Sequence, residues 1–593
     1  LSQAYEFATV AEMTASAVVF PVGKKLNTIV NNTLSNTGGA SYVVSDTATA
    51  DGYGNHALTG GNVAELLLED GLADITKFAA VYFDDGDSTD AINKACELAK
   101  GILIPAGVFK VSGAGIRCPN DFTVKGLGKY TSILKKTTDV TDLAPILRER
   151  SGFLPVSNLT VDSVGFIGNG DENNKAPSKG AGLIRFYESY NILITDCLFT
   201  KSTGYGVGFQ GSWSSGDVGK KGPHEDTKII NCEFIENGRQ EYTDASDSDD
   251  GIDFKGSVRL TVDNCTAKGN GDKGFDLRGI DVTVTNCVSY DNQGAGFNHG
   301  VETYGTERTS TGVFTNCIAH GNAGVGFNCN GQYGVLGALS TIYSSFNSCI
   351  AYNNVHNFSA QSAGSNAFGV THLSISNCMS RNSTTGTRGL QISGNIRDLS
   401  VVGTTFTENP DGGASCNVID NIESTVSFSG CVFKGNGTAL VLSENLGVRQ
   451  AVNSCVFADN LGQAIIGVGD SDGILLSGNV YDNNVGRNIN LTGINSLVYD
   501  NPRGSRSVSD QSSITLNPES KLYVASGSVE INEIIGGYDG QEIKILLSTV
   551  GKSIVTSSTI RLNSPFVATT TRSLITLCYV TNFWQEVSRS ENA

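Results

Sequence analysis

Four aspartates lie close together near the middle of the chain: Asp247, Asp249, Asp250 and Asp253, in the segment DSDDGIDFKGS (247–257). Two carboxyl groups held side by side ionise at different pH values, which provides one proton donor and one carboxylate. Such a pair can cleave a glycosidic bond by acid–base chemistry. The same oxygens could coordinate Ca²⁺, although their spacing is not that of an EF-hand loop, and no other motif predicts a metal or a cofactor.

A repeat built around single cysteines predicts the elements that position these acids. Segments such as LTVDNCTA and VTVTNCVS alternate apolar and polar residues, and an Asn/Asp/Gly-rich turn and a second strand such as GIDF or GFDL follow each one. No unit could bury its apolar face alone, so we expect the units to stack as a parallel β-helix of roughly a dozen coils. The repeated position holds these residues, with Thr405 and Asn479 as substitutes: Cys197, Cys232, Cys265, Cys287, Cys317, Cys349, Cys378, Cys431 and Cys455.

The cysteines themselves are expected to be structural. The chain has fourteen, but it lacks any C-x-x-C pair, so a zinc ribbon is not indicated. One small, polarizable residue per coil would form an internal column, which we expect to be reduced. Asn and Gly in the turns suit the left-handed backbone that the corners of the coils require.

The alternation also orients the acids. Ile252 and Phe254 should point inward, which turns Asp253 and Lys255 outward, and the next coil places Asp276 and Arg278 in the same way. One outer line of residues therefore runs Asp253, Asp276, Asn298, Asn328. Neighbouring strands are about 4.8 Å apart, so we expect the carboxyl groups of Asp253 and Asp276 to lie about 5 to 9 Å apart, a range that covers retaining and inverting glycosidases. Outward acids interleaved with Lys and Arg are equally typical of a solvated surface.

Irregular segments supply further candidates. FQGSWSSGDVGKKGPHED (209–226), IENGRQEYTDASDSD (235–249) and HGVETYGTERTSTG (299–312) interrupt the repeat and should lie on one flank of the stack. We expect Glu302 to join the catalytic acids Asp250, Asp253 and Asp276. The residues expected to contact substrate are Trp213, Lys255, Arg278, His299, Tyr304 and Arg308, although the alternation turns His299 inward beside Phe297.

Bulk properties limit the function. The net charge is −18, so clustered phosphate contacts and hence a nucleic-acid partner are not expected. No apolar stretch is long enough to span a membrane, and the first twenty residues show no basic segment before an apolar block, as a signal peptide would.

The organisation along the chain predicts three parts. Residues 1–78 lack the repeat and should form a small head module, residues 79–503 the β-helix, and residues 504–593 a C-terminal β-sandwich that trimerises the chain or binds glycan. An amphipathic helix at 87–101, with Asp87 or Ser88 at its N-terminus and Gly101 as its stop, should cap the open end of the β-helix.

Two motifs at this end resemble a known family. DGDSTDAINKA followed by a strand that ends in P-A-G resembles the start of a pectate-lyase-like, right-handed parallel β-helix, and the preceding AYEFATVAEM, VGKKLNT and GGASY resemble the head module of bacteriophage tailspike depolymerases. The resemblance covers about the first 110 residues, and the coils fit the same family. It implies an all-β homotrimer on the virion tail. The N-terminus would attach to a tail or baseplate adaptor, and the chain would fold in the host cytoplasm and act outside the cell on capsule or O-antigen polysaccharide.

A second resemblance concerns the acids. D-G-I-D at 250–253, the acids Asp272 and Asp276 and the tripeptide N-H-G at 298–300 are similar to the N-T-D-G-I-D, acidic pair and G-H-G motifs of polygalacturonase-type glycosidases. This resemblance implies catalytic roles for Asp250 and Asp253. The preceding Asn-Thr is absent, and the acidic pair is not contiguous.

Three functions fit these observations. The first is hydrolysis of a surface polysaccharide by paired carboxylates. The second is a polysaccharide lyase, in which Lys255 or Arg278 would neutralise a uronate and Tyr304 or His299 would move a proton. The third is a non-catalytic adhesin that binds glycan through Trp213 and Tyr304.

Overall fold

The structure is a computed structural model that describes most of the chain. The described residues are all except 1–3, 33–36, 69–71, 82–85, 114, 138–143, 150–153, 171–181, 211–223, 240–248, 301–307, 331–339, 362–368, 385, 395, 419–423, 443–447, 469–473, 486–488, 493–505, 510–512, 516–521, 527–529, 536–541, 548–550, 570–572, 581–582 and 591–593. They divide into two compact units: residues 1–306 with 310–312 and 322–324, and the remainder to residue 593.

The first unit begins with a small sheet that has its own core. Its strands run in the order β1-β2-β4-β6-β5, β3 pairs with β2, and Met13, Phe20 and Tyr42 are buried beside the sheet. The elements are β1 (Tyr5–Thr9), α1 (Val10–Ala15), β2 (Lys25–Asn32), β3 (Thr37–Gly38), β4 (Ser41–Ser45), β5 (His56–Ala57) and β6 (Val63–Leu66).

A short helix precedes the first coils. The helix α2 (Thr89–Leu98) follows the 3-10 helix η1 (Ile75–Phe78) and buries Ala91, Ile92 and Ala95. It is shorter than the expected 87–101. The backbone is already extended at Ala99, and Gly101, the expected stop, is instead the first residue of strand β8. Ser88 occupies the N-cap position without a side-chain cap, while Asp87 accepts a hydrogen bond from the Thr89 N–H at 3.0 Å.

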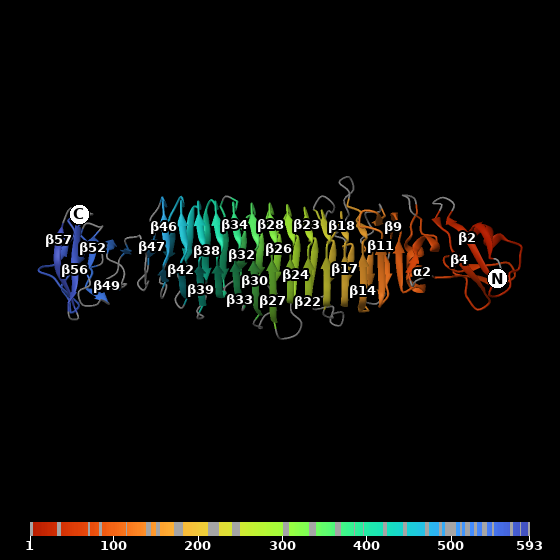
Figure 1. Ribbon diagram of the computed structural model, residues 1–593, viewed down its shortest axis with the longest axis horizontal. Coiled ribbons are helices and arrows are strands. Elements are labelled where there is room, and N and C mark those ends of the chain that lie inside the picture. Colours follow the sequence, from red (N-terminus) through yellow and green to blue (C-terminus); the bar gives the residue numbers. More distant parts are fainter. Residues whose placement is uncertain are drawn as a thin grey trace. The chain divides into compact units, whose positions relative to one another are not determined.

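The rest of the first unit is a parallel β-helix with three strands in each coil, one more than the repeat predicts, and these strands form three parallel stacks (Figure 1). The first stack contains β7 (Leu72–Asp74), β8 (Gly101–Ile104), β11 (Phe122–Gly126), β14 (Val156–Asp162), β17 (Ser189–Thr195), β20 (His224–Ile230) and the later halves of β22 (Ile252–Asp263) and β24 (Phe275–Thr285). The second contains β10 (Ile116–Cys118), β13 (Leu147–Glu149), β16 (Ile184–Phe186), β19 (Val207–Gln210), the earlier halves of β22 and β24, and β26 (Phe297–Gly300). The third contains β9 (Gly107–Val111), β12 (Ser132–Lys136), β15 (Gly165–Ile167), β18 (Leu198–Thr200), β21 (Glu233–Ile235), β23 (Thr266–Lys268) and β25 (Val288–Tyr290).

The second unit repeats this three-stack architecture. Strand β27 (Arg308–Thr315) is divided between the units. Its first stack has β30 (Ser340–Asn347), β33 (Gly369–Ser376), β36 (Ile396–Val402), β39 (Ser424–Ser429), β42 (Val448–Asn453) and β45 (Ile474–Ser477). The second has β29 (Phe327–Asn330), β32 (Phe358–Gln361), β35 (Leu390–Gly394), β38 (Gly412–Val418), β41 (Thr438–Leu442), β44 (Ile465–Val468) and β47 (Ile489–Thr492). The third has β28 (Ile318–His320), β31 (Ile350–Tyr352), β34 (Met379–Arg381), β37 (Thr405–Thr407), β40 (Val432–Lys434), β43 (Val456–Ala458) and β46 (Val480–Asp482).

The last part of the chain has its own mixed sheet, in the order β48-β50-β52-β56-β57-β54, with Tyr523, Ile545 and Trp584 in its core. Its strands are β48 (Arg506–Ser509), β49 (Ser513–Thr515), β50 (Leu522–Ser526), β51 (Glu533–Ile535), β52 (Glu542–Leu547), β53 (Ser553–Ile554), β54 (Ile560–Arg561), β55 (Phe566–Val567), β56 (Ser573–Val580) and β57 (Phe583–Ser590). The domain limits at residues 78 and 503 stay a prediction.

Among the described residues, no helix has the length and apolarity needed to cross a membrane.

The repeated cysteines lie inside the coils, as predicted, and all are free thiols. Their Sγ–H groups donate to nearby backbone carbonyls, for example Cys232 to Ile230 at 3.2 Å. Thr405 was the wrong substitute, because Thr404 accepts the hydrogen bond from the Cys378 N–H, while Asn479 does take the predicted position next to Cys455. The corners at Asn231, Asn264 and Asn286 have positive φ angles of 56°, 51° and 55°, as the Asn-rich turns predict.

Candidate active site

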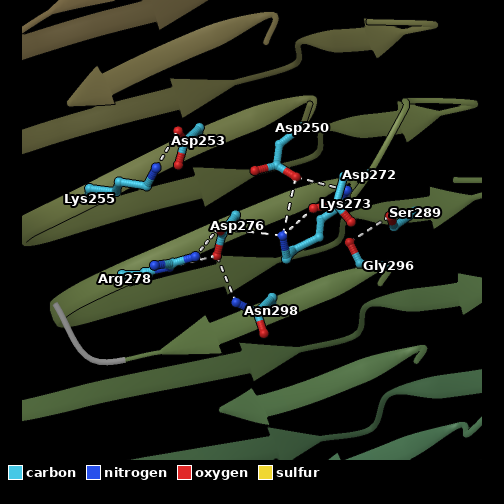
Figure 2. Close-up of polar contacts among 10 residues, drawn as sticks. All are labelled: Asp250, Asp253, Lys255, Asp272, Lys273, Asp276, Arg278, Ser289, Gly296 and Asn298. Carbon is cyan, nitrogen blue, oxygen red and sulfur yellow. Dashed lines mark hydrogen bonds and ion pairs between the residues drawn. The ribbon is translucent and has the colours of Figure 1, made fainter. Parts of the chain in front are cut away.

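Strands β22 and β24 bring the predicted acids together in the first unit. They pair in parallel, with Asp253 opposite Asp276 and Lys255 opposite Arg278, and β26 continues the line by placing Asn298 opposite Asp276 (Figure 2). Asn328 lies on β29 in the second unit. The alternation of apolar and polar residues therefore predicted the register correctly, because inward Ile252 and Phe254 fix which side Asp253 must face.

The acids are much less exposed than an outward, solvated position predicts. Asp250, Asp253 and Asp276 are only 5%, 2% and 1% exposed, so a solvated surface is the wrong interpretation of this line of residues. One coil earlier, Gly208 lies opposite Asp253. The ring of Tyr205 lies over Gly208 so closely that a Cβ there would come within 2.0 Å of it.

Asp276 is held as a carboxylate. Arg278 donates from Nε and Nη2 to its two oxygens at 3.1 and 2.6 Å, and the Asn298 amide donates to Oδ1 at 2.7 Å. Lys273 Nζ lies 3.8 Å from Oδ2. Burial alone would raise the pKa of Asp276, but the charges of Arg278 and Lys273 and these hydrogen bonds outweigh it, so the pKa lies well below its ordinary value.

The pKa of Asp250 is shifted in the opposite direction to that of Asp276. Burial, the largest influence, raises the pKa of its carboxyl group well above the ordinary value, and the charges of Asp276 and Asp253 raise it further. Lys273 opposes this shift: its backbone N–H donates to Asp250 Oδ1 at 2.8 Å, and its Nζ lies 3.6 Å from the same atom. Two acids of one cluster therefore favour different protonation states.

Asp253 completes the cluster. Its Oδ2 lies 2.9 Å from Lys255 Nζ. One oxygen from each of Asp250, Asp253 and Asp276 lies within 4.8 Å of one from each of the others, at the short end of the expected separation. We call these three residues the acid cluster.

Three cationic side chains surround the acid cluster and are more exposed than the acids themselves. The side chains of Lys273, Lys255 and Arg278 are 21%, 27% and 30% exposed. Lys273 also contacts Asp272 at 2.5 Å. A divalent cation bound by the three carboxylates would lie beside these positive charges, so the donor set fits Ca²⁺ poorly.

The structure gives His299 a different place from the one expected for a substrate contact. Its ring is fully buried, as the alternation predicts, with Nε2 3.0 Å from Ser310 Oγ. Burial lowers its pKa to about 4, so it is neutral at ordinary pH. This residue packs the interior of the coil.

The other candidates cannot be placed. Trp213, Glu302 and Tyr304 lie outside the described residues, and Arg308 is described only as the first residue of β27, without its side chain.

Sequence reasoning missed Lys273 and Tyr205. Lys273 lies in the turn just before β24, and Tyr205 lies just before β19, so neither occupies a strand position whose direction the alternation fixes. The signal for Lys273 was its position between Asp272 and Asp276 in GDKGFD.

One comparison with known proteins identifies the fold of the region around the acid cluster. A family model described as right-handed beta helix region matches residues 155–338, which include the acid cluster. This region is thus a right-handed parallel β-helix, as predicted. A search of curated proteins found no match.

A search of solved structures found further similarities. The chain is similar to the A-module of a mannuronan C-5 epimerase from Azotobacter vinelandii, with 16% identity over 72% of this chain and 99% of that one and a TM-score of 0.41. It is also similar to a tailspike protein, a capsular polysaccharide depolymerase, of the Acinetobacter baumannii bacteriophage Fri1, with 13% identity over 81% and 76% and a TM-score of 0.44. A third is the catalytic unit of an α-1,3-glucanase from Streptomyces thermodiastaticus, with 14% identity over 79% and 80% and a TM-score of 0.35.

Proposed function

We propose that this protein is a tailspike-type depolymerase that hydrolyses glycosidic bonds of a bacterial capsule or O-antigen polysaccharide at the acid cluster. The observation that carries the proposal is the opposite shift of two neighbouring acids: the pKa of Asp250 is raised, and that of Asp276 is lowered. Pairs of carboxyl groups whose environments separate their pKa values supply the acid and the carboxylate that glycoside hydrolysis needs.

The contacts suggest how the roles are divided. Asp250 retains a proton at higher pH than an ordinary aspartate and would donate it to the leaving glycosidic oxygen. Asp253 lies between Asp250 and Asp276 in the chain, forms an ion pair with Lys255, and would act as the nucleophile or the base toward the sugar. Asp276, saturated by Arg278 and Asn298, would remain ionised and stabilise positive charge that develops on the sugar ring.

A lyase is the second candidate, and the cations favour it. Lys255, Lys273 and Arg278 surround the cluster, and cations beside a uronate carboxylate would stabilise the carbanion that a β-elimination forms. The acids then serve only to hold these cations. Against this candidate, the contacts described above for the acid cluster, with Lys255, Lys273, Arg278 and Asn298, include no histidine or tyrosine to accept the proton.

Three isosteric variants, Asp250→Asn, Asp253→Asn and Asp276→Asn, test the proposal. Each should lower the rate of oligosaccharide release from the host polysaccharide by about 100-fold or more, the usual contribution of an acid–base group. Asp281→Asn on the exposed part of the same strand β24 is the matched control and should leave the rate unchanged. Full activity in all three folded variants would contradict the site, and the absence of released oligosaccharide with wild type would favour a non-catalytic adhesin.

The remaining properties of the protein follow the tailspike resemblance and are part of the proposal. We propose a homotrimer that is attached to the phage tail through its N-terminal module and acts outside the host cell. We also propose catalysis without a bound cation, since Lys255, Lys273 and Arg278 already balance the acid cluster. EDTA should therefore not change the rate.

A further inference from the structure

Three arginines on successive coils form a line on the same stack as the acid cluster. Arg117 on β10, Arg148 on β13 and Arg185 on β16 are in register. Each lies between two buried residues of its strand and is itself exposed or half-buried, so all three side chains face out of the coil. We call these residues the arginine row.

Among the described residues, the arginine row brings three like charges together. Adjacent strands are about 4.8 Å apart, and like charges directly opposite one another destabilise a sheet. Within the described part of the chain, the row forms an ion pair with Glu149, whose Oε1 lies 3.9 Å from Arg148 Nη2. Glu149 is 1% exposed, and burial raises the pKa of its carboxyl group, which weakens it as a counter-charge. Among the described residues, the one ion pair of these three guanidinium groups is that of Arg148 with Glu149.

The guanidinium groups also have unused hydrogen-bonding capacity. The Nε atoms of Arg148 and Arg185 are enclosed and have no hydrogen-bond partner among the described residues. The Arg185 guanidinium lies over the ring of Tyr187, with its Cζ 4.8 Å from the ring centroid, which restrains its orientation. A planar guanidinium held in this way is suited to bidentate binding of a carboxylate or a phosphate.

The arginine row leads directly to the acid cluster. Arg185 lies opposite Gly208, and Gly208 lies opposite Asp253. Two strand spacings therefore separate Arg185 from Asp253, about 10 Å at the backbone. The ring of Tyr205 covers the intervening Gly208. A chain-like ligand lying along this stack would contact both groups.

We infer that the arginine row is a binding subsite for anionic groups, such as uronate carboxylates, of a polysaccharide that extends along the stack to the acid cluster. This inference rests on the proposed function and deepens it, because it makes the substrate an acidic polysaccharide. The arginine row would bind the anionic groups of sugar units next to the cleaved bond. Because the protein has a net charge of −18, an acidic polysaccharide should be repelled by most of the molecule and attracted to this row.

Affinity electrophoresis tests the inference without requiring cleavage. The probe is polygalacturonate, and the matched neutral probe is the same polymer after carboxyl reduction. Wild type should bind the acidic polymer more tightly than the neutral one. The double variant Arg148→Gln/Arg185→Gln should weaken binding of the acidic polymer by about tenfold or more, and Arg148→Lys/Arg185→Lys should lie between, since lysine keeps the charge but loses the bidentate fork.

The control variant changes the same charge elsewhere. Arg397→Gln/Arg449→Gln removes two exposed arginines of the second unit and should bind like wild type. The unfolding temperature of the Gln double variant without glycan should not fall, because like-charge repulsion has been removed. Equal binding of the two polymers by wild type, or unchanged binding by the Gln double variant, would overturn the inference. So would a change in sedimentation mass of that variant, which would assign the row to a contact between copies of the chain.

The outcome separates the two proposals. If the arginines govern binding of the acidic polymer but no host polysaccharide is cleaved, the proposed hydrolase fails and the anionic subsite stands. If cleavage depends on the acid cluster but binding ignores the arginines, the hydrolase stands and the subsite fails.

Discussion

At the scale of single residues, Lys273 links the two acids whose pKa values diverge. Its Nζ lies 3.6 Å from Asp250, 2.5 Å from Asp272 and 3.8 Å from Asp276. Burial alone would lower the pKa of this lysine, but the surrounding carboxylates raise it well above its ordinary value. It therefore remains charged and lowers the pKa of Asp250 and Asp276 together.

Lys273→Met should consequently move the pH profile of kcat/KM to higher pH. Without the lysine charge, the pKa of Asp276 rises, so the acidic limb moves up. The pKa of Asp250, which burial already raises, rises further, so the alkaline limb moves up as well. Lys273→Arg should restore the original profile, and Lys228→Met on the exposed face of β20 serves as control. An unchanged profile for a folded Lys273→Met protein would show that Lys273 has only a structural role.

The sequence predicted part of this site and missed the rest for a physical reason. Alternation along a strand fixes the side on which Asp253 and Asp276 lie, and their register followed from it. It carries no information about what covers that side, so the burial of the acids was not predicted. Lys273 reaches the acids from a turn, where no such periodicity applies.

At the scale of elements, buried asparagines hold the turns of successive coils together. Asn270 accepts hydrogen bonds from the backbone N–H and the amide of Asn237 at 3.0 and 3.1 Å, and its own amide donates to Phe234 O and Asn292 Oδ1 at 3.1 and 2.9 Å. The turn that contains Asn270 leads through Lys273 into β24 and Asp276. The position of the acid cluster thus depends on this ladder.

Asn270→Ala should destabilise the protein by about 2 kcal/mol or more, because it leaves buried donors and acceptors on two neighbouring coils without partners. Urea unfolding measures this loss. Thr283→Ala, at an exposed position of β24, should change the unfolding free energy by less than about 0.5 kcal/mol. Similar stabilities for the two variants would contradict the structural role of the ladder.

The first coils of the β-helix lack the repeated cysteine that predicts the register of the later coils. The cysteine repeat begins at Cys197 and gave the register of the coils that follow. The coils of β10, β13 and β16 precede it and lack the marker residue, so Arg117, Arg148 and Arg185 could not be aligned from the sequence, and the arginine row came only from the structure.

At the scale of the whole molecule, the right-handed β-helix presents chemical groups in lines, one residue per coil, and this suits a polymeric ligand. The fold followed from the sequence because a repeated buried residue and an alternating pattern allow little else. The activity does not follow from the fold, because a fold alone does not determine a function. For the proposed depolymerase, the addition of water to the cleaved bond distinguishes a hydrolase from a lyase.

Mass spectrometry of the fragments released from purified capsule or O-antigen of the host tests the central claim most directly. Hydrolysis predicts fragments whose masses equal whole repeat units plus one water, with no new ultraviolet absorbance, and Asp253→Asn should release almost none. Fragments that lack this water and absorb in the ultraviolet, because they carry an unsaturated sugar, would contradict hydrolysis at the acid cluster and establish a lyase.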